Sequence, residues 1–127
     1  ECFGAHALIV PEKGSASITD GAIKSSSGAL LRLPVCRVSN ISSALDFLKN
    51  SGIACVALSE KSAVGLPENE VKAPYCLVLG DEGYGISSEV MQLCDHRIKI
   101  PMVGKTASLN VSVSAGIALY ALNAVKI

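Results

Sequence analysis

The sequence predicts a single α/β domain in which a mainly parallel sheet is covered by helices on both faces. Short apolar runs alternate along the chain with segments of helical periodicity. Within each run the apolar residues are continuous, which is typical of strands buried on both faces. The length of 127 residues suits one domain, and half of the residues are hydrophobic.

The first half of the chain contains three of the predicted strands. Residues 5–10 (AHALIV) form the first, and a loop with a short helical turn at residues 25–31 leads to the second at residues 33–38 (LPVCRV). Residues 42–50 have apolar side chains at helical spacing, a serine cap and a following glycine, so they predict a helix. Residues 53–58 (IACVAL) predict the third strand.

The second half continues the alternation. Residues 59–74 are rich in Glu, Lys, Gly and Pro and predict an exposed connection. A strand is expected at residues 75–79 (YCLVL), a helix at residues 86–94 and a brief strand at residues 97–100. Residues 108–125 are long enough for a closing helix of about five turns.

The loops that follow the strands are the expected place for chemistry, because open parallel sheets bind ligands beyond the carboxyl ends of their strands. These loops follow Leu58, Leu79 and Ile100. The loop after Leu79 reads GDEGYG, and its glycines allow a tight turn and a close approach to a ligand. Its spacing matches neither the dinucleotide fingerprint nor the P-loop, which disfavours phosphate binding by either device.

The loop after Ile100, PMVGKTASLN, delays the closing helix by several residues, so its backbone is a candidate for holding a flat heterocycle. Ser108 and Asn110 lie where that helix begins. Ser108 is expected to cap the helix. A second cap would be redundant, so Asn110 is expected to have another role.

Charge and cysteine content restrict the classes of function and of cellular environment that the sequence allows. Eleven basic residues balance eleven acidic ones, but none of the acidic residues lies after Asp95, so the last part of the chain is basic. This basic segment is consistent with two interpretations, an ordinary solvated face and a patch that faces phosphate groups. The five cysteines occur singly, which predicts buried, reduced thiols in a cytoplasmic protein instead of disulfides or a zinc site. No apolar run approaches the roughly 18 residues of a membrane span.

Several motifs resemble those of the SpoU, or TrmH, class of SPOUT RNA ribose 2′-O-methyltransferases, in order and in spacing. The resemblance covers essentially the whole chain and is most similar to the bacterial branch that methylates a guanosine ribose in large-subunit ribosomal RNA. The motifs that carry it are ECFGAHALIV (residues 1–10), KSSSGAL (24–30), LVLGDEGYGIS (77–87), IKIPM (98–102) and SLNVSVSAGIALY (108–120).

This resemblance implies a trefoil-knotted fold, S-adenosylmethionine as cofactor, RNA as substrate, a homodimer and no metal. The small residues between Ser112 and Ala118 suit a closing helix that threads a knot or packs against a dimer mate. The residues that the resemblance assigns to the cofactor are Gly80, Ile100 and Leu109, with Met102 and Leu58 as weaker contacts. The residues that it assigns to catalysis are Glu82, Ser108 and Asn110.

The family also places an arginine, preceded by an asparagine, in its first motif, where they assist the attacking hydroxyl. Neither is found here, because the chain opens at the tail of that motif, and Arg32 and Arg37 lie on other segments. We therefore expect residues 1–127 to be the knot domain of a longer protein, without its first strand and first motif. We also expect this fragment to bind cofactor without catalysing transfer. An inactive RNA-binding relative and an unrelated nucleotide-binding or hydrolase domain are the alternatives.

Overall fold

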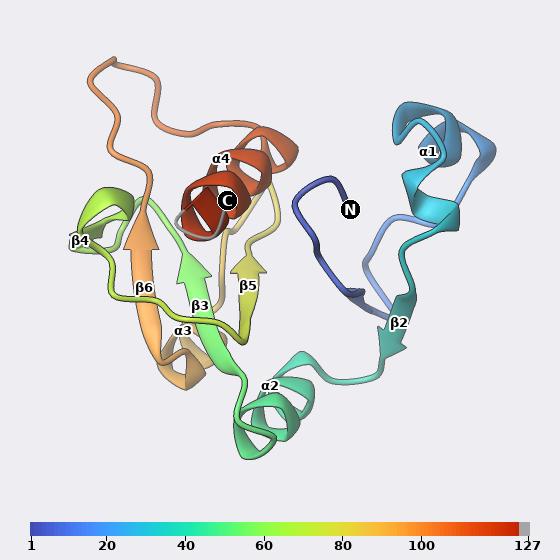
Figure 1. Cartoon of the computed structure of the whole chain (residues 1–127), viewed down its shortest axis with the longest axis horizontal. Helices are drawn as coiled ribbons and strands as arrows, with labels where there is room; N and C mark the ends of the chain where they lie inside the picture. The colour runs from blue at the N-terminus through green and yellow to red at the C-terminus, as the bar shows by residue number, and fades with distance from the viewer. Residues whose placement is uncertain (125–127) are drawn as a thin grey trace. The chain divides into compact units, whose positions relative to one another are not determined.

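The computed structural model describes residues 1–124. The chain divides into two compact units, Glu1–Ala44 and a second that begins at Leu45, and each is described by itself (Figure 1). In the first unit, β1 (Leu8–Pro11) pairs in parallel with β2 (Val35–Val38). The chain connects these two strands through α1 (Asp20–Ser25) and the 3-10 helix η1 (Ala29–Leu31). The Thr19 side chain caps α1.

The second unit is built on a parallel sheet of four strands in the order β4-β6-β3-β5. β3 (Ala54–Leu58) lies in the middle, between β5 (Tyr75–Leu79) and β6 (His96–Lys99). β4 (Val64–Gly65) adds a short edge beside β6. The predicted parallel sheet is confirmed.

Helix α4 (Val111–Asn123) covers one face of this sheet, as Figure 1 shows. Ala118 and Leu122 of the helix are buried. The Tyr75 hydroxyl also hydrogen-bonds Asn123 Oδ1 at 3.1 Å, which ties the end of α4 to β5. The core on this face consists of Val56, Leu58, Leu66, Ile98, Ala118 and Leu122.

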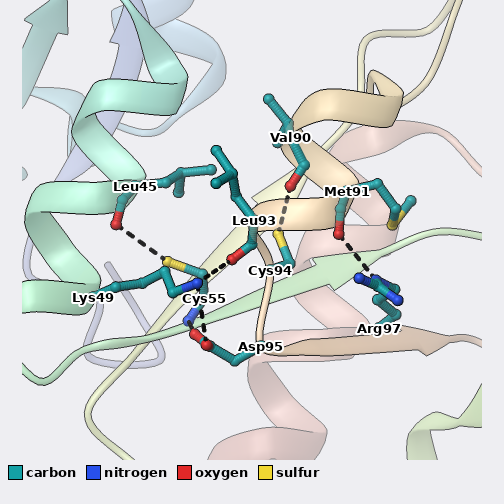
Figure 2. Close-up of polar contacts among 9 residues, drawn as sticks. All are labelled: Leu45, Lys49, Cys55, Val90, Met91, Leu93, Cys94, Asp95 and Arg97. Atoms are coloured by element: carbon teal, nitrogen blue, oxygen red, sulfur yellow. Dashed lines mark hydrogen bonds and ion pairs between the residues drawn. The ribbon is translucent and has the colours of Figure 1, made fainter.

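The opposite face contacts the second-unit part of α2 (Ile41–Asn50) and α3 (Ser88–Leu93) (Figure 2). Successive strand residues point to opposite faces, so Cys55 points away from the neighbouring Val56. The Cys55 thiol donates to the Leu45 carbonyl at 3.8 Å, and Arg97 Nε donates to the Met91 carbonyl of α3 at 2.9 Å. Helices therefore lie on both faces of the sheet, as predicted.

Asp95 ties the start of β6 to β3 (Figure 2). Its amide donates to the Cys55 carbonyl at 2.8 Å, and its Oδ2 accepts from the Cys55 amide at 2.8 Å. Lys49 Nζ lies 3.5 Å from Asp95 Oδ1 and donates to the Leu93 carbonyl at 2.7 Å. The hydrogen bond from the Cys55 amide, assisted by Lys49, lowers the pKa of Asp95.

The segment between β3 and β5 corrects one expectation. Residues 59–74 were expected to be an exposed connection, but they contain β4 and the 3-10 helix η2 (Leu66–Glu68). Ser62 and Leu66 are buried there, because β4 joins the sheet and Leu66 fills the core beneath α4. The short apolar stretch was missed in the sequence because charged residues and prolines flank it.

Several boundaries also differ from those expected. β1 begins at Leu8, α1 was not predicted as a helix, and α4 begins at Val111 instead of residue 108. Val125, the expected end of the closing helix, lies outside the described residues. Across residues 1–124, none of the helices combines the length and the apolar character needed to span a membrane.

Candidate active site

A pocket of about 610 Å³ lies at the carboxyl ends of β3, β5 and β6. The loops after these three strands form its walls, together with the first turn of α4, so the site is where the sheet topology predicts it. It lies entirely within the second unit. Its lining comprises residues 58–61, residues 79–86, Ile100, Met102, residues 107–111 and Ser114.

The GDEGYG loop is held by its own first acidic residue. Asp81 Oδ1 accepts hydrogen bonds from the amides of Gly83 and Tyr84, both at 2.7 Å. The Gly85 amide donates to the Asp81 carbonyl at 3.1 Å, and Gly85 has φ +71°. This turn brings the backbone of Gly85 so close to Gly80 that a side chain at position 80 has no room.

Asn110, and not Ser108, caps α4. Its Oδ1 accepts from the Ser112 amide at 2.9 Å and from the Ser112 hydroxyl at 2.6 Å. The expectation that Ser108 caps the helix is therefore wrong, because the helix starts at Val111 and Ser108 lies two residues before the cap. Both side chains are exposed and both line the pocket.

The structure brings all eight predicted site residues into this one pocket. Leu58 is buried at the end of β3, Gly80 and Ile100 are half-buried, and Met102 and Leu109 are exposed on the last loop. The three residues expected in catalysis, Glu82, Ser108 and Asn110, are exposed on its walls. All eight residues therefore line the same pocket, and the roles assigned to them stay predictions.

Sequence reasoning missed part of the lining. Ser59, Glu60 and Lys61 follow directly after β3, and the rule that ligands bind beyond strand ends could have identified them. Tyr84 and Ser114 also line the pocket without having been singled out. The lining carries three acidic residues and one basic residue, so the pocket favours a cation over an anion. These are Glu60, Asp81 and Glu82, and Lys61.

The cysteines lie away from this pocket and are all free. Burial raises the pKa of both Cys55 and Cys94 to about 11, whereas Cys2 and Cys36 are exposed, so the expectation of buried thiols is wrong for those two. Within the part of the chain that the structure describes, His, Cys, Asp and Glu side chains form no cluster of three suited to a metal ion.

The fold also occurs in solved RNA methyltransferases. The SpoU methyltransferase AviRb from Streptomyces viridochromogenes, solved in complex with the cofactor AdoMet, superposes with a TM-score of 0.88 at 28% identity, covering 98% of this chain and 49% of that one. A structure described as an RNA 2′-O ribose methyltransferase superposes with a TM-score of 0.82 at 27% identity, covering 95% of this chain and 46% of that one.

Similarity in sequence leads to the same class. An uncharacterized tRNA/rRNA methyltransferase of Synechocystis sp. is 42% identical over 120 residues, which is 94% of this chain but 31% of the relative's length. A family model described as the SpoU rRNA Methylase family matches residues 1–120. From this match, together with the parallel sheet and the pocket at its strand ends, we conclude that the chain belongs to the SpoU rRNA Methylase family.

Proposed function

We propose that this chain carries the cofactor-binding part of an enzyme that transfers a methyl group from S-adenosylmethionine to a ribose 2′-hydroxyl of ribosomal or transfer RNA. The observation that carries the proposal is the convergence of the eight predicted site residues, from four separate segments, on one pocket. Both the volume of about 610 Å³ and the position beyond the strand ends suit a nucleoside ligand.

The chemistry of the lining fits this cofactor. Leu79, Met102 and Leu109 keep 37%, 38% and 39% of their surface exposed, which leaves apolar area for an adenine ring. The GDEGYG loop, Met102 and residues 107–110 contribute the backbone beside that surface. The surplus of carboxylates suits a ligand that carries a positive sulfonium and an ammonium group.

When bound, the cofactor supplies an electrophilic methyl group on sulfur. In the transfer a bond forms between this methyl carbon and the ribose 2′-oxygen, the carbon–sulfur bond breaks, and the hydroxyl proton must be accepted by a base. We assign Glu82 to the proton chemistry of this pocket, and Ser108 and Asn110 to ordering the ribose. Support for these roles comes from their shared pocket and from the family motifs.

We further infer that the molecule pairs with a second copy through α4. Val113, Ile117 and Tyr120 are 49%, 39% and 58% exposed, and their spacing puts them along one stripe of the helix. In sedimentation experiments Ile117→Glu should shift a dimer to the monomer, whereas Ser112→Glu should leave it paired. A wild-type monomer would contradict the pairing.

A guanosine ribose of large-subunit ribosomal RNA, modified in the cytoplasm, is the specific target that we propose. The motif resemblance supports the target, and the five free cysteines suit a reducing compartment. The chain spans about a third to a half of the length of curated relatives that it matches, so the activity is a property to test in the full-length protein.

The test is ribose-methylation mapping of RNA from cells with and without the full-length protein, followed by transfer of labelled methyl groups by the purified enzyme. One ribose that loses its methyl group in the deletion, and regains it in vitro, would support the proposal. Unchanged methylation, together with bound RNA and no transfer, would instead indicate an inactive RNA-binding relative.

A further inference from the structure

Tyr84 lines the pocket and is also almost fully exposed to solvent, a combination that places its side chain at the mouth. Its residue surface is 94% exposed, and no other aromatic residue within 1–124 lines the pocket. A tyrosine normally buries much of its ring when its role is to pack. Since Tyr84 buries almost nothing, packing does not account for an aromatic residue at this position.

The backbone that carries Tyr84 is fixed. Its amide is one of the two that donate to Asp81 Oδ1 at 2.7 Å, and an antiparallel bridge joins Asp81 to Gly85 immediately beyond it. A ring presented from a pinned turn loses less conformational entropy on binding than one on a loose loop. The loop therefore presents a preorganised aromatic surface.

The charges around Tyr84 limit what can bind there. Asp81 and Glu82 precede it in the loop, Glu60 also lines the pocket, and Lys61 is the one cation of the pocket within the described residues. Phosphate groups of an RNA strand are disfavoured beside such a surplus of carboxylates. A nucleobase is uncharged, and every base offers a face that stacks on an aromatic ring.

The position of Tyr84 also suits a base better than the cofactor. The apolar side chains that suit an adenine ring, Leu79, Met102 and Leu109, are 37% to 39% exposed, whereas Tyr84 is 94% exposed. A ribose that enters the pocket brings its base to the mouth, because the two are directly bonded. An aromatic ring at the mouth is placed to meet that base or its neighbour.

We propose that Tyr84 is a stacking platform for a base of single-stranded RNA at the mouth of the pocket. This inference rests on the proposed function, and it adds the residue that receives the substrate strand. It makes RNA affinity depend on the aromatic face of residue 84, and not on its hydroxyl group or on apolar area alone.

The test measures binding of a single-stranded oligoribonucleotide that contains 2-aminopurine to the full-length protein and its variants. Tyr84→Ala should weaken binding about 5- to 150-fold, the range that loss of one stacked base produces. Tyr84→Phe should bind as the wild type does, and Tyr84→Leu should resemble Tyr84→Ala. Quenching of 2-aminopurine should follow the same order.

Phe47→Ala is the matched control, because Phe47 is a 72% exposed aromatic residue outside the pocket lining. Equal RNA affinity of wild type and Tyr84→Ala, or of Tyr84→Leu and Tyr84→Phe, would overturn the inference. Calorimetry with S-adenosylmethionine separates this result from the larger proposal. Cofactor binding with RNA affinity insensitive to residue 84 overturns the stacking role alone, whereas absence of cofactor binding overturns the proposed function.

Discussion

A methyl group on Gly80 would lie 2.4 Å from the carbonyl carbon of Gly85. That separation is far below van der Waals contact, and the obstructing atoms are backbone atoms that cannot rotate away. The GDEGYG loop thus closes on itself in a way that only glycine at position 80 permits. The shape of one pocket wall depends on this single close approach.

Gly80→Ala should therefore reshape the loop and weaken S-adenosylmethionine binding by at least about tenfold, because a loss of about 1.4 kcal/mol already corresponds to that factor. Titration calorimetry measures the effect. Gly104→Ala is the control, since an added Cβ there meets nothing within 4 Å. Equal affinities of the two variants would show that the loop does not shape the cofactor site.

Substitutions of Asn110 can separate its role as the cap of α4 from its proposed role in ordering the ribose. Asn110→Ala should lower the free energy of unfolding by about 1 kcal/mol, because the Ser112 amide loses its acceptor. Asn110→Asp keeps an acceptor at the cap and should restore stability, while the amide that we assign to the ribose stays lost. Denaturant unfolding and methyl transfer by the full-length protein are the two measurements. Full activity of Asn110→Asp would limit Asn110 to capping.

Asp95 should make stability depend on pH in the acid range. The pKa of Asp95 is lowered from its ordinary value of 3.8, so the stabilisation is present at neutral pH. As the pH falls below 3.8 towards the lowered value in the folded chain, this stabilisation is lost. Because the Asp95 side chain is 37% exposed and solvent screens its charge, Asp95→Asn should cost at most about 1 kcal/mol at pH 7, and progressively less in acid.

The measurement is urea unfolding of wild type and Asp95→Asn between neutral and acid pH. Asp46→Asn, at an exposed aspartate of α2, serves as the reference variant. A difference between Asp95→Asn and wild type that stays constant down to the lowest pH would contradict the assignment.

Four of the five thiols should fall into two classes of reactivity. With a pKa of about 11, Cys55 and Cys94 are thiolate to only about one part in a thousand at pH 8, and both are also buried. Cys2 and Cys36 are exposed and should react first with iodoacetamide, as mass spectrometry of timed samples would show. Early labelling of Cys55 or Cys94 would mean that the structure around these buried thiols opens readily.

Much of the fold could be predicted because its strands are continuous apolar runs. The strand at 75–79 matches β5 residue for residue, and the helix at 42–50 is one residue longer in the structure. The short elements β4 and α1 were missed, since two or six residues with few apolar positions carry little periodicity. The trefoil knot that the resemblance implies stays a prediction.

The site was predictable where a loop follows a strand and carries a motif. Gly80, Glu82 and Asn110 were identified in this way, and they share a pocket. Glu60 and Lys61 were missed because their segment has no motif, and Tyr84 because residue exposure is a property of the folded chain. The cap shows the same limit: Ser108 and Asn110 are both good caps by type, and only the start of α4 decides between them.

The most direct test of the central claim is calorimetric titration of S-adenosylmethionine into the folded chain, with the Gly80→Ala and Gly104→Ala variants in parallel. One cofactor should bind saturably per pocket, more weakly in Gly80→Ala and with unchanged affinity in Gly104→Ala. A folded wild-type chain that shows no binding would contradict the claim.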